Sequence, residues 1–489
     1  AWSPDGDVLW AGTDDGRVHR TTDEGATWED VTPEQLPEWA WITCIEPDPH
    51  AAGTAYLTAT AYRLQDRTPY LLVTRDGGQT WAPAATGIEP DDYLRVVRAD
   101  PARPGVLYAG SESRAYFSLD GAESWHPLRL NMPAVPIYDL AVVGDELVAA
   151  SHGRGFWILD GLHVLGHLSE PEGAPSAALL VPDFAYRFPI ASERERGATM
   201  GLQYLGTAAA FRPDPGKPDR TVLNGGENPP DGVTVRYFLP EPVEEGSLGL
   251  TVLDATGAQV IALAPSALGV SAGFHRAVWD LRATGPRPLP AADPDEDAKE
   301  TRGPLVPPGR YTVRLEGPGV SLSGEVEVRA DPRLDLSADA FSRQYQVGLR
   351  IREERDRVTD AIARLRRVRE QVTRWNGGGG DGGDDQGIRD AAARILERLD
   401  ALERQLTQPG IKDDADRLKF PAGLDQKLGA LSDLLDSVDA PPTAATEPVL
   451  EELAQRARAA IGDVNSLIEG PVADLDQRIR RSNLPIVGG

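Results

Sequence analysis

Short runs of alternating apolar and polar residues fill the first third of the chain, separated by turn-forming residues. This period of two is typical of β-strands that bury one face. The runs come in groups, and each group predicts one small antiparallel sheet. The groups are Val8–Gly12 with Arg17–Thr21, Ala55–Thr60 with Tyr70–Thr74, Val106–Gly110 with Ala115–Ser118, and Tyr138–Val143 with Glu146–Ser151.

Three similar octets follow the first three groups: Thr21–Trp28, Thr74–Trp81 and Ser118–Trp125. Their aspartates are 53 and 44 residues apart, close to the ~40–50-residue period of propeller blades. We expect Asp to accept backbone hydrogen bonds in a tight turn, Gly to take a positive φ and Trp to pack across the sheet. These structural roles are assigned to Asp23, Gly25, Trp28, Asp76, Gly78, Trp81, Asp120 and Trp125.

Two features qualify the octets. Ala122 replaces the glycine of the third copy, which predicts a strained or altered turn. A catalytic role for the aspartates is the alternative, but catalytic carboxylates work in facing pairs with tuned pKa values.

The octets resemble the Asp-box, or BNR, repeat of sialidases, xyloglucanases and sortilin. The string His152–Asp160, HGRGFWILD, is similar to the end of the last blade in bacterial proteins described as sortilin/Vps10-like or "glycosyl hydrolase, BNR repeat" proteins. The resemblance implies an incomplete Asp-box β-propeller over residues 1–165, with further blades preceding it. The chain would then be the C-terminal portion of such a protein, which fits its start at Ala1.

The middle of the chain predicts a second β-region. Residues 166–225 are rich in Pro and Gly and are expected to form a linker packed on the propeller. Six strand-like runs over 226–332 predict an Ig/fibronectin-III-like β-sandwich with Trp279 at its core.

The last third switches to a helical period, which predicts an antiparallel helical bundle over 337–482. Pro471 should kink or break the last helix. A dimerisation face on these helices is the alternative to an intramolecular core. The expected helices are Asp339–Trp375, Ile388–Thr407, Ala422–Val438 and one from Glu447. The fold class is therefore multidomain, mainly β and then α.

Charge and composition narrow the partners. Acidic residues outnumber basic ones by 76 to 50, for a net charge of −26, which disfavours nucleic acid. No apolar run is long enough to span a membrane. The single cysteine, Cys44, is expected to be a buried thiol. The resemblance implies a secreted, periplasmic or cell-surface protein.

No cofactor is indicated. Calcium is an alternative at the acidic run Asp293–Asp297 and the Gly/Asp tract Asn376–Asp385, but neither spacing matches a known ligand loop. A solvated loop and a flexible linker are the expected readings.

Candidate ligand-contacting residues are few. The sequence holds no nucleophile elbow, zinc helix or phosphate loop. His152 and Arg154 flank Gly153 between two strands. There they would either contact a ligand or pack where the propeller ring closes. Trp39 and Trp41 lie in an inter-strand loop and are candidate platforms for sugar stacking.

Two functions remain open. The first is a non-catalytic, extracytoplasmic scaffold that binds a protein, peptide or glycan. The second is a glycoside hydrolase, sialidase-like or xyloglucanase-like, with paired carboxylates on the propeller face.

Overall fold

The structure is a computed structural model, and it describes residues 1–128, 131–168, 176–188, 211–213, 220–222, 230–289, 301–376, 386–411, 416 and 418–481. The chain divides into two compact units. The first comprises Ala1–Pro175 with Ala209–Pro229, and the second comprises Ser176–Ala208 with Pro230–Gly489. Of the two tracts considered for calcium, Asp293–Asp297 and residues 377–385 lie outside the described residues.

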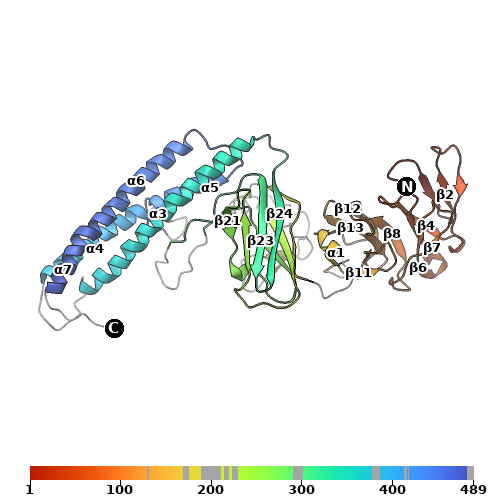
Figure 1. The fold of residues 1–489 in the computed structure, drawn as a ribbon, viewed down its shortest axis with the longest axis horizontal. Coiled ribbons are helices and arrows are strands. Elements are labelled where there is room, and N and C mark those ends of the chain that lie inside the picture. Colours follow the sequence, from red (N-terminus) through yellow and green to blue (C-terminus); the bar gives the residue numbers. More distant parts are fainter. Residues whose placement is uncertain are drawn as a thin grey trace. The chain divides into compact units, whose positions relative to one another are not determined.

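Small antiparallel sheets build the first unit (Figure 1), and in each of them consecutive strands pair. The first sheet is β1 (Leu9–Gly12), β2 (Val18–Thr21) and β3 (Glu29–Asp30). The second is β4 (Trp41–Pro47), β5 (Ala55–Ala61), β6 (Asp66–Thr74) and β7 (Ala82–Pro83). The third is β8 (Leu94–Ala99), β9 (Leu107–Ser111), β10 (Ala115–Ser118) and β11 (His126–Leu128), and the fourth is β12 (Ile137–Val143), β13 (Glu146–Ser151) and β14 (Phe156–Asp160).

Each of these sheets packs against the next through its own apolar layer. The first layer joins Trp10 and Val18 to Leu57 and Trp81, and the second joins Leu71 and Val73 to Leu94, Leu107 and Trp125. A third layer joins Val96 and Tyr108 to Ile137, Leu140 and Leu147. The alternating pattern therefore predicted the small antiparallel sheets correctly.

The octets form the turns β2–β3, β6–β7 and β10–β11. Asp76 accepts hydrogen bonds from the Thr80 backbone N–H (2.9 Å) and the Thr80 hydroxyl (2.6 Å), and from the Thr74 hydroxyl (2.9 Å). Asp23 and Asp120 accept the same three bonds from the matching positions. The three carboxylates thus lie in three separate turns, and each accepts hydrogen bonds from residues of its own octet.

The backbone of the octets is equally regular. Gly25 and Gly78 both have φ of +91°, and Ala122 has φ of +68° at the same position. Each donates its N–H to the first Ser or Thr of its octet, at 2.7–3.0 Å. The turn at Ala122 therefore keeps the shared geometry and places a non-glycine residue in the left-handed region.

Two sheets and one apolar core make up the β-region of the second unit. One sheet has the order β15-β19-β22 and the other β16-β24-β23-β20-β21. Trp279 is 1% exposed in the core and donates its indole N–H to the Arg282 carbonyl at 2.9 Å. The strands are β15 (Ala178–Leu180), β16 (Phe184–Arg187), β19 (Val233–Leu239), β20 (Gly249–Leu253), β21 (Gln259–Ala262), β22 (Gly273–Trp279), β23 (Gly309–Gly317) and β24 (Val320–Ala330).

Strands β15 and β16 differ from the prediction that 166–225 is a linker resting on the first unit. β15 pairs antiparallel with β19, and β16 pairs parallel with β24. These pairings satisfy the backbone hydrogen bonds of the segment within the second unit. The short hairpin β17 (Phe211–Pro213) and β18 (Arg220–Val222), by contrast, belongs to the first unit.

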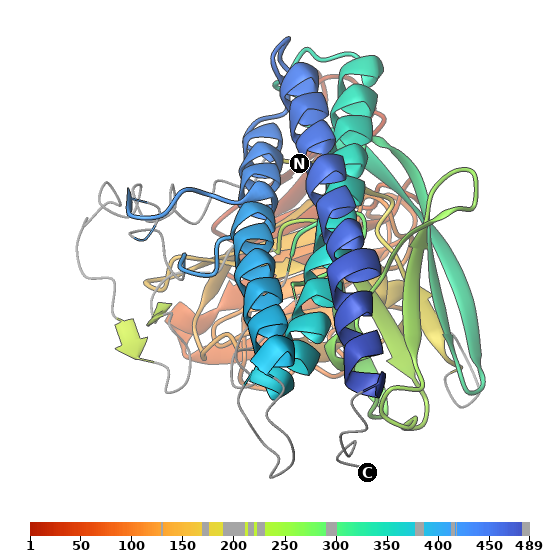
Figure 2. The ribbon, with the colours of Figure 1, turned by 90° about the vertical axis from the view of Figure 1, so that its left-hand side faces the viewer.

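Five α-helices follow within the described residues: α3 (Ala338–Asn376), α4 (Gln386–Leu406), α5 (Leu424–Asp436), α6 (Thr446–Leu467) and α7 (Ala473–Arg481). Helices α3, α4 and α6 lie side by side and share one apolar core (Figures 1 and 2). Pro471 does not break the chain into separate helices, because a π-helical turn over Ile468–Val472 connects α6 to α7. A π-helical turn accommodates proline, which has no backbone N–H to donate to the preceding turn.

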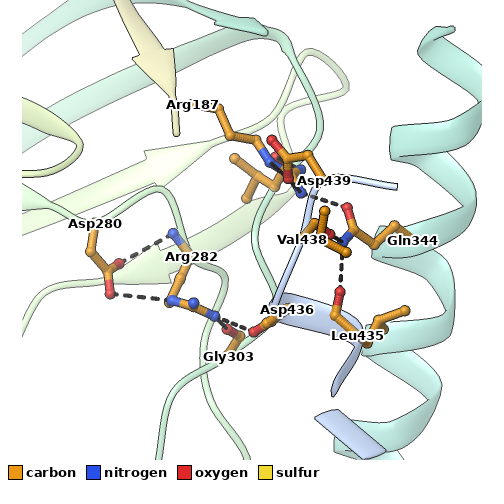
Figure 3. Close-up of polar contacts among 10 residues, drawn as sticks. Arg187, Asp280, Arg282, Gly303, Gln344, Leu435, Asp436, Val438 and Asp439 are labelled. Carbon is orange, nitrogen blue, oxygen red and sulfur yellow. Dashed lines mark hydrogen bonds and ion pairs between the residues drawn. The ribbon is translucent and has the colours of Figure 1, made fainter. Parts of the chain in front are cut away.

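A buried ion pair fastens the β-region of the second unit to its helices (Figure 3). Arg187, at the end of β16, is fully buried and binds Asp439 at 2.6 Å in the connection after α5. Gln344 of α3 accepts from Arg187 at 2.5 Å and donates to the carbonyls of Leu435 and Val438 at 2.7 and 2.9 Å. Arg187 thus links one strand, one helix and one loop.

Candidate functional site

The candidate site lies at one common edge of the second, third and fourth sheets. In each of these sheets the start of the first strand pairs with the end of the second. Trp41 lies opposite Thr60, Leu94 opposite Ser111, and Ile137 opposite Ser151. Side chains just before or after these positions therefore project at the same end of three consecutive sheets.

Stacked rings connect the second and third sheets at this edge. Tyr62, in the 3-10 turn Tyr62–Leu64 after β5, stacks on Tyr93 just before β8, with centroids 5.1 Å apart and an interplanar angle of 11°. The Arg63 guanidinium lies over the Trp41 ring at 4.8 Å. The Arg67 guanidinium lies over Tyr93 at 5.3 Å. Guanidinium groups over ring faces fix the orientation of both partners.

Arg95 extends the contacts to the fourth sheet. Its guanidinium lies 5.2 Å from the Tyr93 centroid and 4.1 Å from the Tyr138 centroid. Tyr138 in turn stacks on His152 at 4.9 Å. Glu112 binds Arg95 at 2.5 Å and holds it in place. We call the resulting surface the aromatic–arginine strip; its members are Trp41, Tyr62, Arg63, Arg67, Tyr93, Arg95, Tyr138 and His152.

Several rings of the strip and its surroundings are open to solvent. Trp41 is 37% exposed and Tyr138 48% exposed, while Trp39, two residues before β4, is 67% exposed. Trp39 also has φ of +63°, an unusual conformation for a bulky residue. Tyr93, at the centre of the strip, is only 4% exposed, so the exposed rings lie on either side of it.

Burial and Glu112 set the protonation states of Tyr93 and Arg95. Burial raises the pKa of Tyr93, and the nearby Glu112 carboxylate adds to the rise. Burial is the largest single influence on Arg95 and opposes its charge, but the hydrogen bond to Glu112 and the charge interactions with Glu112, Tyr93 and Tyr138 together outweigh it, so the pKa of Arg95 is raised. At neutral pH Tyr93 is therefore a neutral phenol and Arg95 a cation.

Of the four residues singled out in the sequence as ligand contacts, Trp41 and His152 lie in the strip. Trp39 precedes Trp41 closely, and Arg154 is exposed in the turn between β13 and β14. Sequence reasoning missed Tyr62, Arg63, Arg67, Tyr93, Arg95 and Tyr138. The sequence did carry one signal for them. An aromatic residue lies at or next to the start of β4, β8 and β12: Trp41, Tyr93 and Tyr138.

A polar cluster separate from the strip joins β4, β8 and β12, the first strands of the second, third and fourth sheets. Arg98 of β8 binds Glu46 of β4 at 3.2 Å and Asp139 of β12 at 2.7 Å. Burial raises the pKa of Glu46. Arg98 also donates to the Cys44 sulfur at 3.0 Å. Cys44 is partly rather than fully buried, and burial raises the pKa of its thiol, which disfavours reactivity.

No group of three or more His, Cys, Asp or Glu side chains in the described ranges is placed to hold a metal ion. None of the helices that the structure describes is long and apolar enough to cross a membrane.

No protein-family model matches the chain, and no curated protein matches it. Solved structures do match parts of it. A structure titled YCF48 bound to D1 peptide is 19% identical over 31% of this chain and 47% of that chain, with a TM-score of 0.25. The GH74 enzyme of Niastella koreensis is 17% identical over 33% of this chain and 23% of that chain, with a TM-score of 0.25. An ancestral GH74 enzyme is 16% identical over 58% of this chain and 32% of its own length, with a TM-score of 0.27.

Proposed function

We propose that the first unit is part of an Asp-box β-propeller and works as a non-catalytic, extracytoplasmic binding scaffold. Its ligand, a protein, peptide or glycan, binds on the aromatic–arginine strip. The second unit, an Ig/fibronectin-III-like sandwich followed by a helical bundle, presents the propeller. Domain limits of 1–165 for the propeller, 226–332 for the main part of the sandwich and 337–482 for the bundle belong to this proposal. Dimerisation through the helices remains a further prediction.

The observation that carries this proposal is the continuity of the strip across three sheets. Ring contacts of 4.9–5.1 Å and guanidinium–ring contacts of 4.1–5.8 Å connect Trp41 to His152 without interruption. Because the rings are held by one another before any ligand arrives, little side-chain entropy is lost on binding. Aromatic residues and arginine are also the side chains that contribute most to binding energy at interfaces.

Glycan and peptide arrays probed with the whole chain test this proposal. We expect a small set of related ligands whose signal falls at least tenfold in Tyr138→Ala, since truncation of a central aromatic contact costs about 1–2 kcal/mol or more. Phe274→Ala, which removes an aromatic side chain that is 42% exposed in the second unit, is the matched control. Equal binding by both variants would exclude the strip as the binding surface.

A glycoside hydrolase is the second candidate, and Glu46 with Asp139 is the observation that favours it. Both carboxylates approach one guanidinium, that of Arg98, and the pKa of Glu46 is raised as a general acid requires. The same guanidinium occupies the space between them, where a glycosidic oxygen would have to lie. This arrangement favours a structural ion cluster, and we therefore rank the binding scaffold first.

The hydrolase candidate is tested by turnover of aryl-glycosides and polysaccharides. Hydrolysis that is lost in Glu46→Gln and kept in Glu146→Gln would establish it and displace the scaffold. Glu146 is the matched control because burial raises the pKa of its carboxyl as well. The scaffold proposal expects no turnover by the wild-type chain.

A further inference from the structure

Two guanidinium groups of the strip are exposed and lie outside its ion pairs. Arg63 donates from its Nε to the Tyr62 hydroxyl at 3.3 Å, and Arg67 donates from its Nε to the Asp91 backbone carbonyl at 3.1 Å. Neither guanidinium forms an ion pair with another described residue, and both side chains are exposed. Their terminal N–H groups therefore face solvent, while their planes are fixed over Trp41 and Tyr93.

Three of the nearby carboxylates are engaged elsewhere, and the side chain of Asp91, whose backbone carbonyl accepts from Arg67, is exposed. Asp66 accepts from the Tyr70 hydroxyl at 2.6 Å and from the Thr68 N–H at 2.9 Å. Asp92 is buried and accepts from the hydroxyls of Ser111, Ser113 and Tyr116 at 2.7–2.9 Å. Glu112 is bound to Arg95. In a chain with a net charge of −26, two exposed arginines without such partners form a local site for an anion.

The shape of these cations selects the kind of anion. A guanidinium offers two parallel N–H groups that match the two oxygens of one carboxylate. Trp41, which is 37% exposed and has the Arg63 guanidinium over its ring, and Trp39, which is 67% exposed and lies two residues earlier in the chain, also offer exposed indole faces. Such faces pack against the C–H face of a pyranose ring. A ligand that satisfies both features carries a saturated ring and a carboxylate in the same repeating residue.

We propose that the ligand of the strip is a carboxylated polysaccharide, with uronate carboxylates bound by Arg63 and Arg67 and sugar rings stacked on Trp41 and Trp39. This inference rests on the proposed binding function of the strip and adds the class of ligand. An acidic peptide supplies carboxylates, but apart from proline it carries no saturated ring for the tryptophan faces. The strip therefore favours the polysaccharide.

The test compares polygalacturonate with the same polymer after reduction of its carboxyl groups. We expect the wild-type chain to bind the uronate form at least tenfold more tightly, because each charge-assisted hydrogen bond contributes about a tenfold change in affinity. The preference should shrink at about 1 M salt, where the Debye length is about 3 Å. The double variant Arg63→Gln with Arg67→Gln should bind both polymers equally.

Two further variants separate the ligand class from the binding function. Arg310→Gln, which removes an exposed arginine of the second unit, is the charge control and should keep the preference. Trp41→Ala should lower the affinity for both polymers by a similar factor. Unchanged thermal unfolding of all variants shows that the fold is retained.

The outcomes divide clearly. Equal wild-type affinity for both polymers would overturn the carboxylate proposal and leave strip binding intact. Binding of poly-glutamate but not of either polysaccharide, lost in the double arginine variant, would assign an acidic peptide instead and overturn the polysaccharide. Absence of binding to all three probes would also overturn this ligand class, while the array experiment judges the binding function separately.

Discussion

The indole N–H of Trp81 donates a 2.9 Å hydrogen bond to the backbone carbonyl of Val31, fifty residues earlier and at the end of the preceding sheet. Trp125 repeats the contact with the carbonyl of Ala84 at 2.8 Å. The tryptophan of each of these octets thus ties its own sheet to the one before it. Trp81 and Trp125 are 8% and 2% exposed, whereas Trp28 in the first octet is 45% exposed.

Replacing the Trp81 indole with the smaller phenyl ring of phenylalanine removes this hydrogen bond and leaves a gap in the buried layer, and both changes should cost stability. We predict that Trp81→Phe lowers the free energy of unfolding of the first unit by about 1–3 kcal/mol, because the Val31 carbonyl loses its partner in a buried layer. Trp28→Phe should change it by no more than about 0.5 kcal/mol. Urea unfolding followed by near-ultraviolet circular dichroism measures both, and equal effects would contradict the role of the hydrogen bond.

Glycines at the fifth position of the octets should differ in their tolerance of a side chain. Both Gly25 and Gly78 have φ of +91°, so alanine costs roughly 1–2 kcal/mol at either site. A Cβ on Gly78 would also lie 3.0 Å from the Trp10 ring, whereas one on Gly25 would meet nothing closer than 3.8 Å. We predict that Gly78→Ala is the more destabilising by about 1–3 kcal/mol, from overpacking. Thermal unfolding compares the two, and the idea fails if Gly25→Ala is equally damaging.

Acid should weaken the octet turns. Hydrogen bonds from Thr80 lower the pKa of Asp76 from 3.8 to about 2, and Thr27 does the same for Asp23. Because the folded-state pKa lies below that of the unfolded chain, the carboxylates stabilise the fold above pH 3.8 and lose this effect as the pH falls towards 2.

The variant Asp76→Asn isolates this titration. It should have a lower Tm than the wild type at neutral pH, and the difference should shrink steadily as the pH falls from 3.8 to about 2. Asp23→Asn should behave in the same way. A Tm difference that is independent of pH over this interval would show that the turn does not depend on the ionised carboxylate.

The buried pair Arg187–Asp439 should be intolerant of a single neutral substitution. Asp439→Asn leaves a fully buried guanidinium without its counter-charge, and we predict a loss of about 3–5 kcal/mol in the stability of the second unit. The double variant Arg187→Met with Asp439→Leu should recover most of this loss. Glu327→Ala removes an exposed ion pair with Arg329 and should change stability by less than about 1 kcal/mol. Denaturation followed by the helical circular dichroism signal measures all three.

The features that could be predicted are those whose defining residues lie close together in the sequence. The octets were readable because Asp, Gly and Trp occupy fixed positions within eight residues, and α3 and α4 because their apolar residues repeat every three or four positions. Strands β15 and β16 were not predicted, because their partners, such as Phe238 for Ala178 and Glu327 for Phe184, lie far away in the sequence. Trp41 and His152 were singled out, but the rest of the strip was missed for the same reason: Tyr62, Arg95 and Tyr138 meet only after three sheets have packed.

Oxidative footprinting tests the central claim, that the aromatic–arginine strip is the binding surface, most directly. The chain is oxidised by hydroxyl radicals with and without the tightest binder from the glycan and peptide arrays. We predict that Trp41 and Tyr138 are protected by the ligand, while Trp2 and Trp28, which are 59% and 45% exposed, are oxidised at unchanged rates. Oxidation of Trp41 and Tyr138 at the same rate with and without saturating ligand would contradict the account.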